Sequence, residues 1–124
     1  MKIICTICSR TKKEDEGFIP AHTRYLGEHI KKVALIANKE KKPFFILSGK
    51  YGLIHQDEKI SYYDYYLEGS AIEIFSKKVC DQLKENGIME IDFYVEEKDS
   101  WFPYKTVLQK GADLAGVSVY IKKV

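Results

Sequence analysis

The chain has 124 residues, a net charge of +2, and 45% hydrophobic and 31% charged residues, a composition typical of a globular domain rather than a disordered chain. No apolar run approaches the roughly 20 residues that span a bilayer, and the N-terminal residues lack the apolar core of a signal peptide. We therefore expect a single α/β domain over residues 1–124, cytoplasmic and without membrane contact.

Apolar runs and helical spacing alternate along the sequence. The runs predict strands at residues 2–7, 44–47, 91–95 and 117–121. Apolar residues spaced for one face of a helix predict helices at residues 23–39, 72–86 and 103–114. Strands that alternate with helices predict right-handed βαβ units. The predicted fold class is α/β, with a mainly parallel sheet of about four strands flanked by helices in a three-layer sandwich.

Local signals mark the ends of the second predicted helix and of one long loop. Ser70, with Glu73 three residues later, forms a capping-box pattern, and Asn86-Gly87 is typical of a helix C-terminus. Residues 9–20 are polar and contain Gly17 and Pro20, which predicts a loop of about a dozen residues. Loops of that length are usually functional or mobile.

Cys5 and Cys8 form a C-x-x-C motif, a pattern found in redox and zinc sites. A thioredoxin-type pair starts a helix, whereas a polar loop is predicted after Cys8. The sequence offers no two further zinc ligands at a suitable spacing. We therefore expect both cysteines to be reduced, unbridged and free of metal, with Cys5 a small buried side chain.

The segment at residues 44–67 carries most of the candidate chemistry. Its apolar run ends in Ser48-Gly49-Lys50-Tyr51-Gly52, and a polar loop then leads to a tyrosine-rich stretch around Asp64. Parallel strands present functional groups from the loops at their carboxyl ends, and the two glycines permit unusual backbone shapes there. The alternative is an ordinary glycine turn with a solvated Lys50 and tyrosines that cover a helix.

Two loops are expected to meet at one edge of the sheet, because neighbouring parallel strands end at the same edge. The first loop carries residues 8–12 and the second carries residues 48–66. This placement predicts that Ser9, Ser48, Lys50 and Asp64 line one concave site.

The side chains of these loops suit a ligand that has a phosphate and a flat ring. Lys50 and Asp64 are the candidate catalytic residues: Lys50 faces a phosphate or a developing anion, and Asp64 acts as a general base or stabilises positive charge on a sugar. Tyrosine faces stack on a base, which is worth about 1–3 kcal/mol per base. The candidate substrate-binding residues are Ser9, Thr11, Lys12, Ser48, Tyr51, Gly52 and Tyr63.

Several short motifs of this chain are shared with known proteins. They read Cys8-Ser9-Arg10-Thr11-Lys12, Pro20-Ala21-His22-Thr23-Arg24-Tyr25, Ile46-Leu47-Ser48-Gly49-Lys50-Tyr51-Gly52-Leu53, and Tyr63-Asp64 before Leu67. Together they resemble an uncharacterised family of small bacterial, archaeal and phage proteins with Cys-Ser-x-x-Lys, Ser-Ala-Lys-Tyr-Gly-Leu and Pro-Tyr-Asp motifs. The YaaA family of peroxide-stress proteins, associated with DNA binding, is similar more distantly. The resemblance implies a domain that works near nucleobases or nucleotides.

Three classes of function fit these residues. The first is a nucleobase- or nucleotide-directed enzyme, a hydrolase of the N-glycosidase type that acts on a nucleoside, a nucleotide or a modified base in nucleic acid. The second is a non-catalytic module that binds nucleotide or nucleic acid, and the third is a phage or host protein-interaction factor. DNA is favoured over RNA as the nucleic acid, and no cofactor or metal is predicted. The sequence does not decide whether catalysis occurs, nor the oligomeric state.

Overall fold

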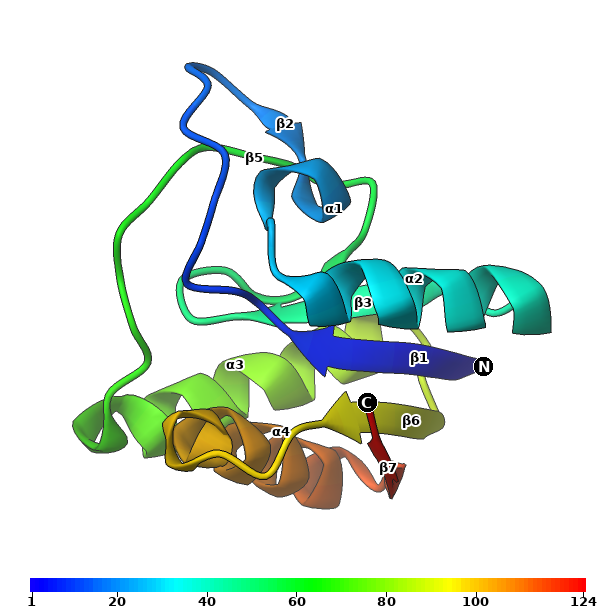
Figure 1. The fold of residues 1–124 in the computed structure, drawn as a ribbon. Helices are drawn as coiled ribbons and strands as arrows, with labels where there is room; N and C mark the ends of the chain where they lie inside the picture. Colours follow the sequence, from blue (N-terminus) through cyan, green and yellow to red (C-terminus); the bar gives the residue numbers. More distant parts are fainter.

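The computed structural model describes residues 1–124, and at its centre lies a five-stranded sheet in the order β4-β3-β1-β6-β7 (Figure 1). Neighbouring strands run parallel except for β3 and β4. The predicted mainly parallel α/β sheet is confirmed, with one strand more than expected. The strands are β1 (Lys2–Ile7), β3 (Phe44–Ser48), β4 (Gly52–His55), β6 (Glu90–Val95) and β7 (Ser118–Lys123).

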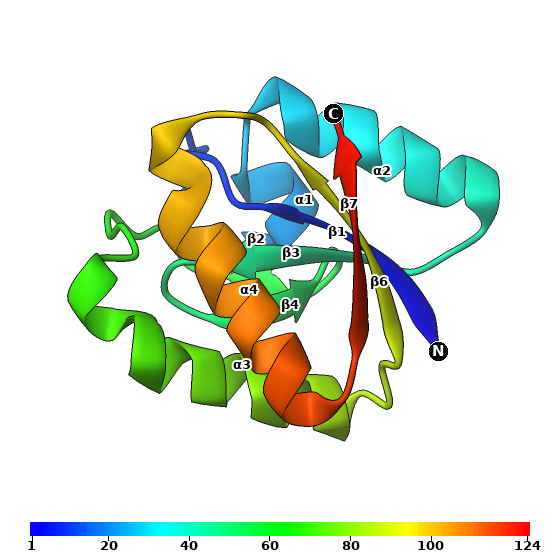
Figure 2. The same cartoon turned by 90° about the horizontal axis from the view of Figure 1, so that it is seen from below.

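Helices cover both faces of the sheet and give the expected three layers (Figure 2). The helix α2 (Glu28–Glu40) lies on one face, whereas α3 (Ile72–Glu85) and α4 (Phe102–Ala115) pack against each other on the opposite face. Because β1 is sandwiched between these layers, Ile3, Ile4 and Cys5 are fully buried. None of the helices is long and apolar enough to cross a membrane.

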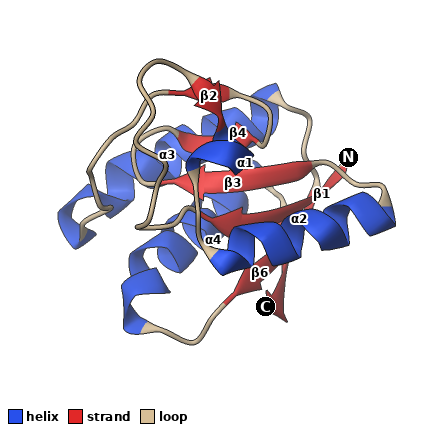
Figure 3. Ribbon diagram, turned by 45° about the horizontal axis from the view of Figure 1, so that its top comes forward, coloured by secondary structure: helices blue, strands red, loops and turns tan.

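A small second unit lies beside α2 and, as Figure 1 shows, away from α3 and α4; its strand β2 is at the top of Figure 3. It consists of the short helix α1 (Ala21–Arg24) and an antiparallel pair, β2 (Ile19–Pro20) with β5 (Lys59–Ile60). Backbone bonds from Ala21 and His22 to the carbonyls of Glu58 and Gln56 fasten this unit to the segment that follows β4. The two long loops of the sequence therefore support each other.

The strand β4 corrects the prediction of an open loop after β3. Ser48 pairs directly with Gly52, so the three residues between them form a tight hairpin turn. Gly52 has φ 78°, the left-handed backbone that three-residue hairpins use and that glycine adopts without strain. The short run Gly-Leu-Ile-His then pairs with β3, a pairing that no local pattern in the sequence announces.

The helix predicted at residues 23–39 is broken in two, and this is a further correction. α1 ends at Arg24, and α2 begins at Glu28 after the extended N-cap residue Gly27. A Cβ atom on Gly27 would lie 2.7 Å from the Cβ atom of Ser9, so the loop after β1 approaches the chain too closely for a larger residue. The break thus lets that loop pack against the start of α2.

The two predicted ends of α3 have opposite outcomes. The capping box at Ser70 and Glu73 is wrong: residues Gly69–Ala71 form a 3₁₀ turn, and the N-cap residue Ala71 makes no side-chain cap. The turn continues directly into the helix, so its own backbone bonds take the place of a side-chain cap. The C-terminus is confirmed, because α3 ends at Glu85 and Gly87 has φ 65°.

Candidate functional site

The carboxyl ends of β1 and β6 flank the point where the chain changes direction across the sheet. From β1 the chain crosses to β3 on one side, and from β6 it crosses to β7 on the other side. Open α/β sheets bind ligands in the crevice at such a switch point, because the loops from the two strands turn away from each other. A cavity of about 450 Å³ lies here, and we call it the switch-point cavity.

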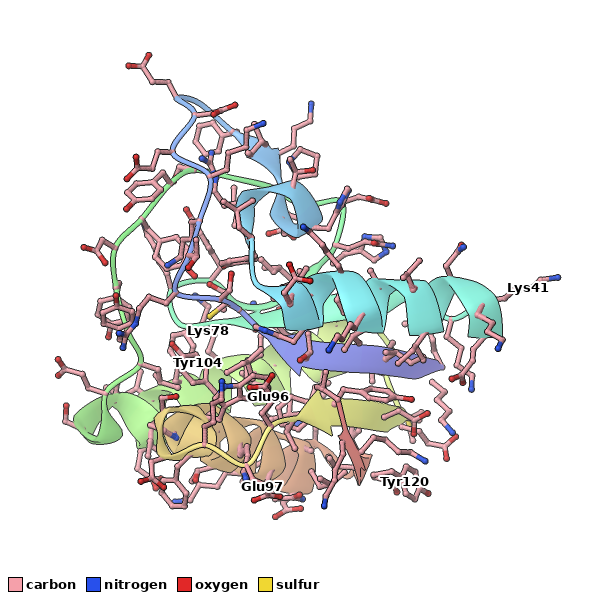
Figure 4. All side chains as sticks on the ribbon, in the orientation of Figure 1. Lys41, Lys78, Glu96, Glu97, Tyr104 and Tyr120 are labelled. Atoms are coloured by element: carbon pink, nitrogen blue, oxygen red, sulfur yellow. The ribbon has the colours of Figure 1, made fainter.

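Four segments line the switch-point cavity. They are residues 7–12 after β1, Glu28 and His29 at the start of α2, residues 96–104 around the 3₁₀ turn Asp99–Trp101, and the pair Tyr65 and Tyr66. In Figure 4 Glu96 and Tyr104 lie near the carboxyl end of β1, whereas Glu97 lies farther from it.

Ser9 and Thr11 shape the wall of this cavity. The hydroxyl of Ser9 donates to the carbonyl of Thr11 at 2.7 Å and accepts from the amide of Gly27 at 3.2 Å. Thr11 is exposed, and its carbonyl also accepts from the amide of Leu26 at 2.9 Å. Both predicted residues therefore line the cavity, and the hydroxyl of Ser9 is occupied in holding the loop against α2.

Lys12 is a buried cation that forms no salt bridge, and the nearest acidic influence on it is the charge of Asp64. Its side chain is 9% exposed, and its ammonium lies 4.6 Å from the ring centre of Tyr63 and 6.0 Å from that of Tyr66. Its single hydrogen bond is donated to the carbonyl of Arg10 at 3.3 Å. Burial lowers the pKa of Lys12, because the ammonium has lost much of its hydration. The cavity thus contains a positive charge held in place by aromatic rings.

Replacing Lys12 by methionine is expected to stabilise the protein at pH 7. A lysine with a lowered pKa in the folded state opposes folding at every pH below that pKa, because both states are then protonated. This destabilising effect decreases as the pH rises toward 10.5, the ordinary pKa of a lysine side chain. Urea denaturation should therefore show a larger free energy of unfolding for the variant than for the wild type at pH 7. Near pH 10 this difference should be smaller. A variant less stable than the wild type at pH 7 would contradict this.

A buried cluster of hydroxyl groups lies at the carboxyl end of β3. The hydroxyl of Tyr63 lies 2.6 Å from that of Tyr25 and 2.9 Å from that of Ser48. Ser48 also accepts the amides of Lys50 and Tyr51, each at 3.1 Å, which fixes the β3–β4 hairpin. Burial raises the pKa of Tyr25 and of Tyr63, so these phenols stay neutral. The cluster is part of the framework of the site.

Three residues predicted to bind substrate are instead engaged in packing and hydrogen bonds within the fold. Ser48 is fully buried and lines no cavity. The hydroxyl of Tyr51 bonds that of Ser61 at 2.8 Å, and its ring packs edge-on against Tyr63. Gly52 lies in β4 beneath Gln82, whose side-chain oxygen accepts the amide of Leu53. The sequence predicted all three in an open loop, whereas in the structure they belong to the β3–β4 hairpin and contact the interior.

Lys50 and Asp64 line a second, shallower hollow of about 480 Å³. We call it the tyrosine hollow; its lining is Gly49, Lys50, Tyr62, Tyr63, Asp64, Tyr65 and Phe75. The single concave site expected from Ser9, Ser48, Lys50 and Asp64 is therefore wrong. The ring of Tyr63 contacts cations of both cavities, because its centre lies 4.6 Å from the ammonium of Lys12 and 5.8 Å from that of Lys50. Tyr65 lines both cavities, so the two are neighbours.

The loop after β6 contributes residues that the sequence reasoning missed. Glu96 accepts a hydrogen bond from Lys98 at 2.9 Å, and this bond lowers the pKa of Glu96, which keeps the carboxylate ionised. Trp101 is nearly buried and lies with its ring centre 4.9 Å from that of His29. The sequence does contain a signal for these residues: a charged run and a tryptophan directly follow the strand predicted at residues 91–95.

His29 and Cys8 complete the inner wall. The Nε2 atom of His29 lies 2.8 Å from the carbonyl of Ile7, which only a protonated nitrogen can bond, so Nδ1 is the free acceptor when the ring is neutral. Burial lowers the pKa of His29 and favours that neutral form. Burial also raises the pKa of the Cys8 thiol, which therefore stays protonated. All three cysteines are free and buried, and no cluster of three potential metal ligands occurs.

Comparison with known proteins gives one match. Residues 3–109 match the model of a family of unknown function, DUF6884. The chain belongs to this family. The matched residues include the whole switch-point cavity and the tyrosine hollow. This membership agrees with the resemblance to an uncharacterised family, while the similarity to YaaA proteins stays a prediction. No curated protein and no solved structure matches the chain.

Proposed function

We propose that this member of the DUF6884 family binds a nucleotide in the switch-point cavity and cleaves its N-glycosidic bond. The observation that carries the proposal is the Lys12 ammonium, which lies among tyrosine rings, forms no salt bridge and lines a cavity with an aromatic wall. A buried charge without a partner is costly in the free protein. An anionic ligand in the cavity would supply the missing partner.

Phosphate binding is supported by several groups around this cation. Arg10 and Lys98 line the same cavity, and both are exposed enough to reach a ligand. The guanidinium of Arg10 lies 5.0 Å from the ring centre of Tyr66, which orients it beside the Lys12 cage. The first turn of α2 also borders the cavity, and its amide groups favour a negative charge there.

The flat walls of the cavity suit a nucleobase. Tyr65 and Tyr66 are 44% and 47% exposed, so their faces are accessible, and Trp101 lines the same cavity beside His29. Stacking of a base on such rings contributes about 1–3 kcal/mol. Phosphate and base together fit a nucleotide better than they fit an inorganic anion or a purely apolar ligand.

Two carboxylates line the cavity, and Glu96 is the candidate for chemistry because its side chain is 32% exposed, whereas that of Glu28 is 80% exposed. In N-glycosidic hydrolysis the bond between C1′ and the base nitrogen breaks, the base leaves with the bonding electrons and gains a proton, and water adds to C1′. The ionised Glu96 would stabilise the positive charge that develops on the sugar and accept a proton from the water. Asp64, the general base proposed from the sequence, lies in the neighbouring hollow as an exposed side chain.

A binding module without catalysis is the second candidate. The pairing of Glu96 with Lys98 favours it, because a carboxylate already engaged by an ammonium is a weaker base. Base release separates the two candidates: the enzyme liberates free base, and the binding module does not.

Titration calorimetry with nucleoside monophosphates and the matching nucleosides tests the proposed function, together with chromatography for released base. The nucleotides should bind more tightly than the nucleosides. Lys12→Gln should weaken nucleotide binding by about 1.5–3 kcal/mol, roughly 10- to 150-fold, through the lost charge-assisted contact. Lys39→Gln, an exposed lysine of α2 that lines neither cavity, is the matched control and should change nothing. Wild-type protein that binds no nucleotide at millimolar concentration would refute the proposal.

A further inference from the structure

Cations and aromatic rings alternate along a continuous strip that joins the two cavities. Each neighbouring pair in the strip is a cation near a ring face, at 4.6 to 6.0 Å from the ring centre. Tyr63 is shared by two cations: the ammonium of Lys12 lies 4.6 Å away and that of Lys50 lies 5.8 Å away. In order, the strip consists of Arg10, Tyr66, Lys12, Tyr63, Lys50 and Tyr51.

Three exposed tyrosines, Tyr66 of the strip and its neighbours Tyr62 and Tyr65, line the two cavities. Tyr62, Tyr65 and Tyr66 are 43%, 44% and 47% exposed, although each is a large aromatic residue that a protein usually covers. Tyr65 lines both cavities, Tyr66 lines only the switch-point cavity, and Tyr62 lines only the tyrosine hollow. Each cavity therefore has accessible aromatic faces of its own as well as a cation.

The tyrosine hollow repeats the chemistry of the switch-point cavity with fewer lining residues. Lys50 supplies the cation, and Lys78 lies close by, with its ammonium 3.5 Å from the carbonyl of Lys50 and 5.6 Å from the ring centre of Phe75. Phe75 and Tyr62 provide the apolar surface. With a first nucleotide in the switch-point cavity, a ligand that repeats a unit of one anionic group and one flat ring would also reach this hollow.

We propose that the two cavities bind successive nucleotides of one single-stranded nucleic acid, with Tyr65 between two neighbouring bases. The inference rests on the proposed function and names its substrate class: a strand rather than a free nucleotide. A polynucleotide repeats a phosphate and a base at each unit, and proteins bind single strands with a cationic groove and stacking rings. A duplex does not fit, because its bases are paired and stacked within the double helix and cannot reach recessed walls.

Asp64 gives the second position a preference for one kind of base. Asp64 is exposed and lines the tyrosine hollow together with Lys50 and the tyrosine rings. A carboxylate repels phosphate but accepts hydrogen bonds from an exocyclic amino group, as aspartate and glutamate do with cytosine. Cytosine is therefore expected to bind in this hollow more tightly than thymine or uracil, which have no amino group.

Fluorescence anisotropy with labelled oligonucleotides of one to eight residues tests the inference. Oligo-dC and oligo-rC distinguish DNA from RNA, and oligo-dT tests the role of Asp64. We expect affinity to rise by about 5- to 150-fold when a second base is added. The plot of log K against log salt has a negative slope. We also expect Lys50→Gln to make this slope less steep by about 0.7, the value for one lost phosphate contact on a single strand.

Matched variants assign the gain to the second cavity. Tyr62→Ala and Lys50→Gln should remove the gain from the second nucleotide and leave the binding of a mononucleotide unchanged. Tyr120→Ala changes a tyrosine with a similar exposed fraction, 46%, on the edge strand β7, and it should have no effect. Asp64→Asn should reduce the preference for dC over dT.

Two results would overturn the inference, and they are distinguishable from failure of the proposed function. If mononucleotides bind but the affinity does not rise with length, the single-strand inference is wrong and the proposed function stands. If the rise with length persists in both Tyr62→Ala and Lys50→Gln, the strand does not use the tyrosine hollow. If neither mononucleotide nor oligonucleotide binds, both proposals fail.

Discussion

Replacing Arg24 by methionine is expected to cost about 2–4 kcal/mol of folding free energy. Arg24 is fully buried, and its guanidinium donates hydrogen bonds to four backbone carbonyls: those of Lys13, Asp15, Gly17 and Ile60. Methionine fills most of the space but donates none of these bonds. The carbonyls at residues 13–17 lie in an exposed loop and can be partly rehydrated, so the loss is smaller than four full bonds to a charged group.

Urea denaturation of the wild type, Arg24→Met and Arg24→Lys measures this effect. Lysine keeps the charge, but its one ammonium cannot reach four carbonyls. The stability of Arg24→Lys should therefore lie between that of the wild type and that of Arg24→Met. Small domains have only about 5–15 kcal/mol of total stability, so the methionine variant is expected to unfold at a clearly lower urea concentration. Equal midpoints for all three proteins would show that the buried guanidinium does not hold the loop.

Replacing Glu96 by glutamine is expected to reduce base release by roughly 10²–10⁴-fold while leaving nucleotide binding near normal. The amide keeps the shape of the side chain and removes the negative charge that stabilises the sugar cation. Chromatography of released base under single-turnover conditions, with binding measured in parallel by calorimetry, separates the chemical step from affinity.

The Asp64→Asn variant is the matched comparison for Glu96→Gln. On a mononucleotide substrate it should retain base release within about tenfold of the wild type, because a solvated carboxylate in the neighbouring hollow contributes little to chemistry in the switch-point cavity. The reverse pattern, a large loss in Asp64→Asn with an intact Glu96→Gln, would restore the assignment of Asp64 as the general base.

Four strands of the central sheet and three main helices could be predicted from the sequence, because each depends on a local pattern. The runs at residues 2–7 and 44–47 are apolar on both sides, as strands between two helical layers must be. The strand β4, the β2–β5 pair and the break at Gly27 were missed. Each of them depends on a partner that is distant in sequence or on the close approach of Ser9, which no local pattern reveals.

The candidate site was predicted in its position and only partly in its composition. Residues 9–12 lie at the carboxyl edge of the sheet as expected, since the direction of a parallel strand fixes where its loop emerges. Tyr63 was predicted as an accessible ring, yet it is buried and bonded to Tyr25 and Ser48. Burial of a phenol depends on which hydroxyl groups surround it in the fold, and their positions follow from the β3–β4 hairpin.

The position of β1 in the middle of the sheet has a consequence for how the chain folds during synthesis. This strand is the first of the five to leave the ribosome, but its partners β3 and β6 begin only at Phe44 and Glu90. Until both have emerged, one of its edges stays unpaired, and unpaired apolar strands are prone to aggregate. The sheet therefore cannot form strand by strand from one edge. In a nascent chain that ends before β6, the edge of β1 that pairs with β6 has no partner strand.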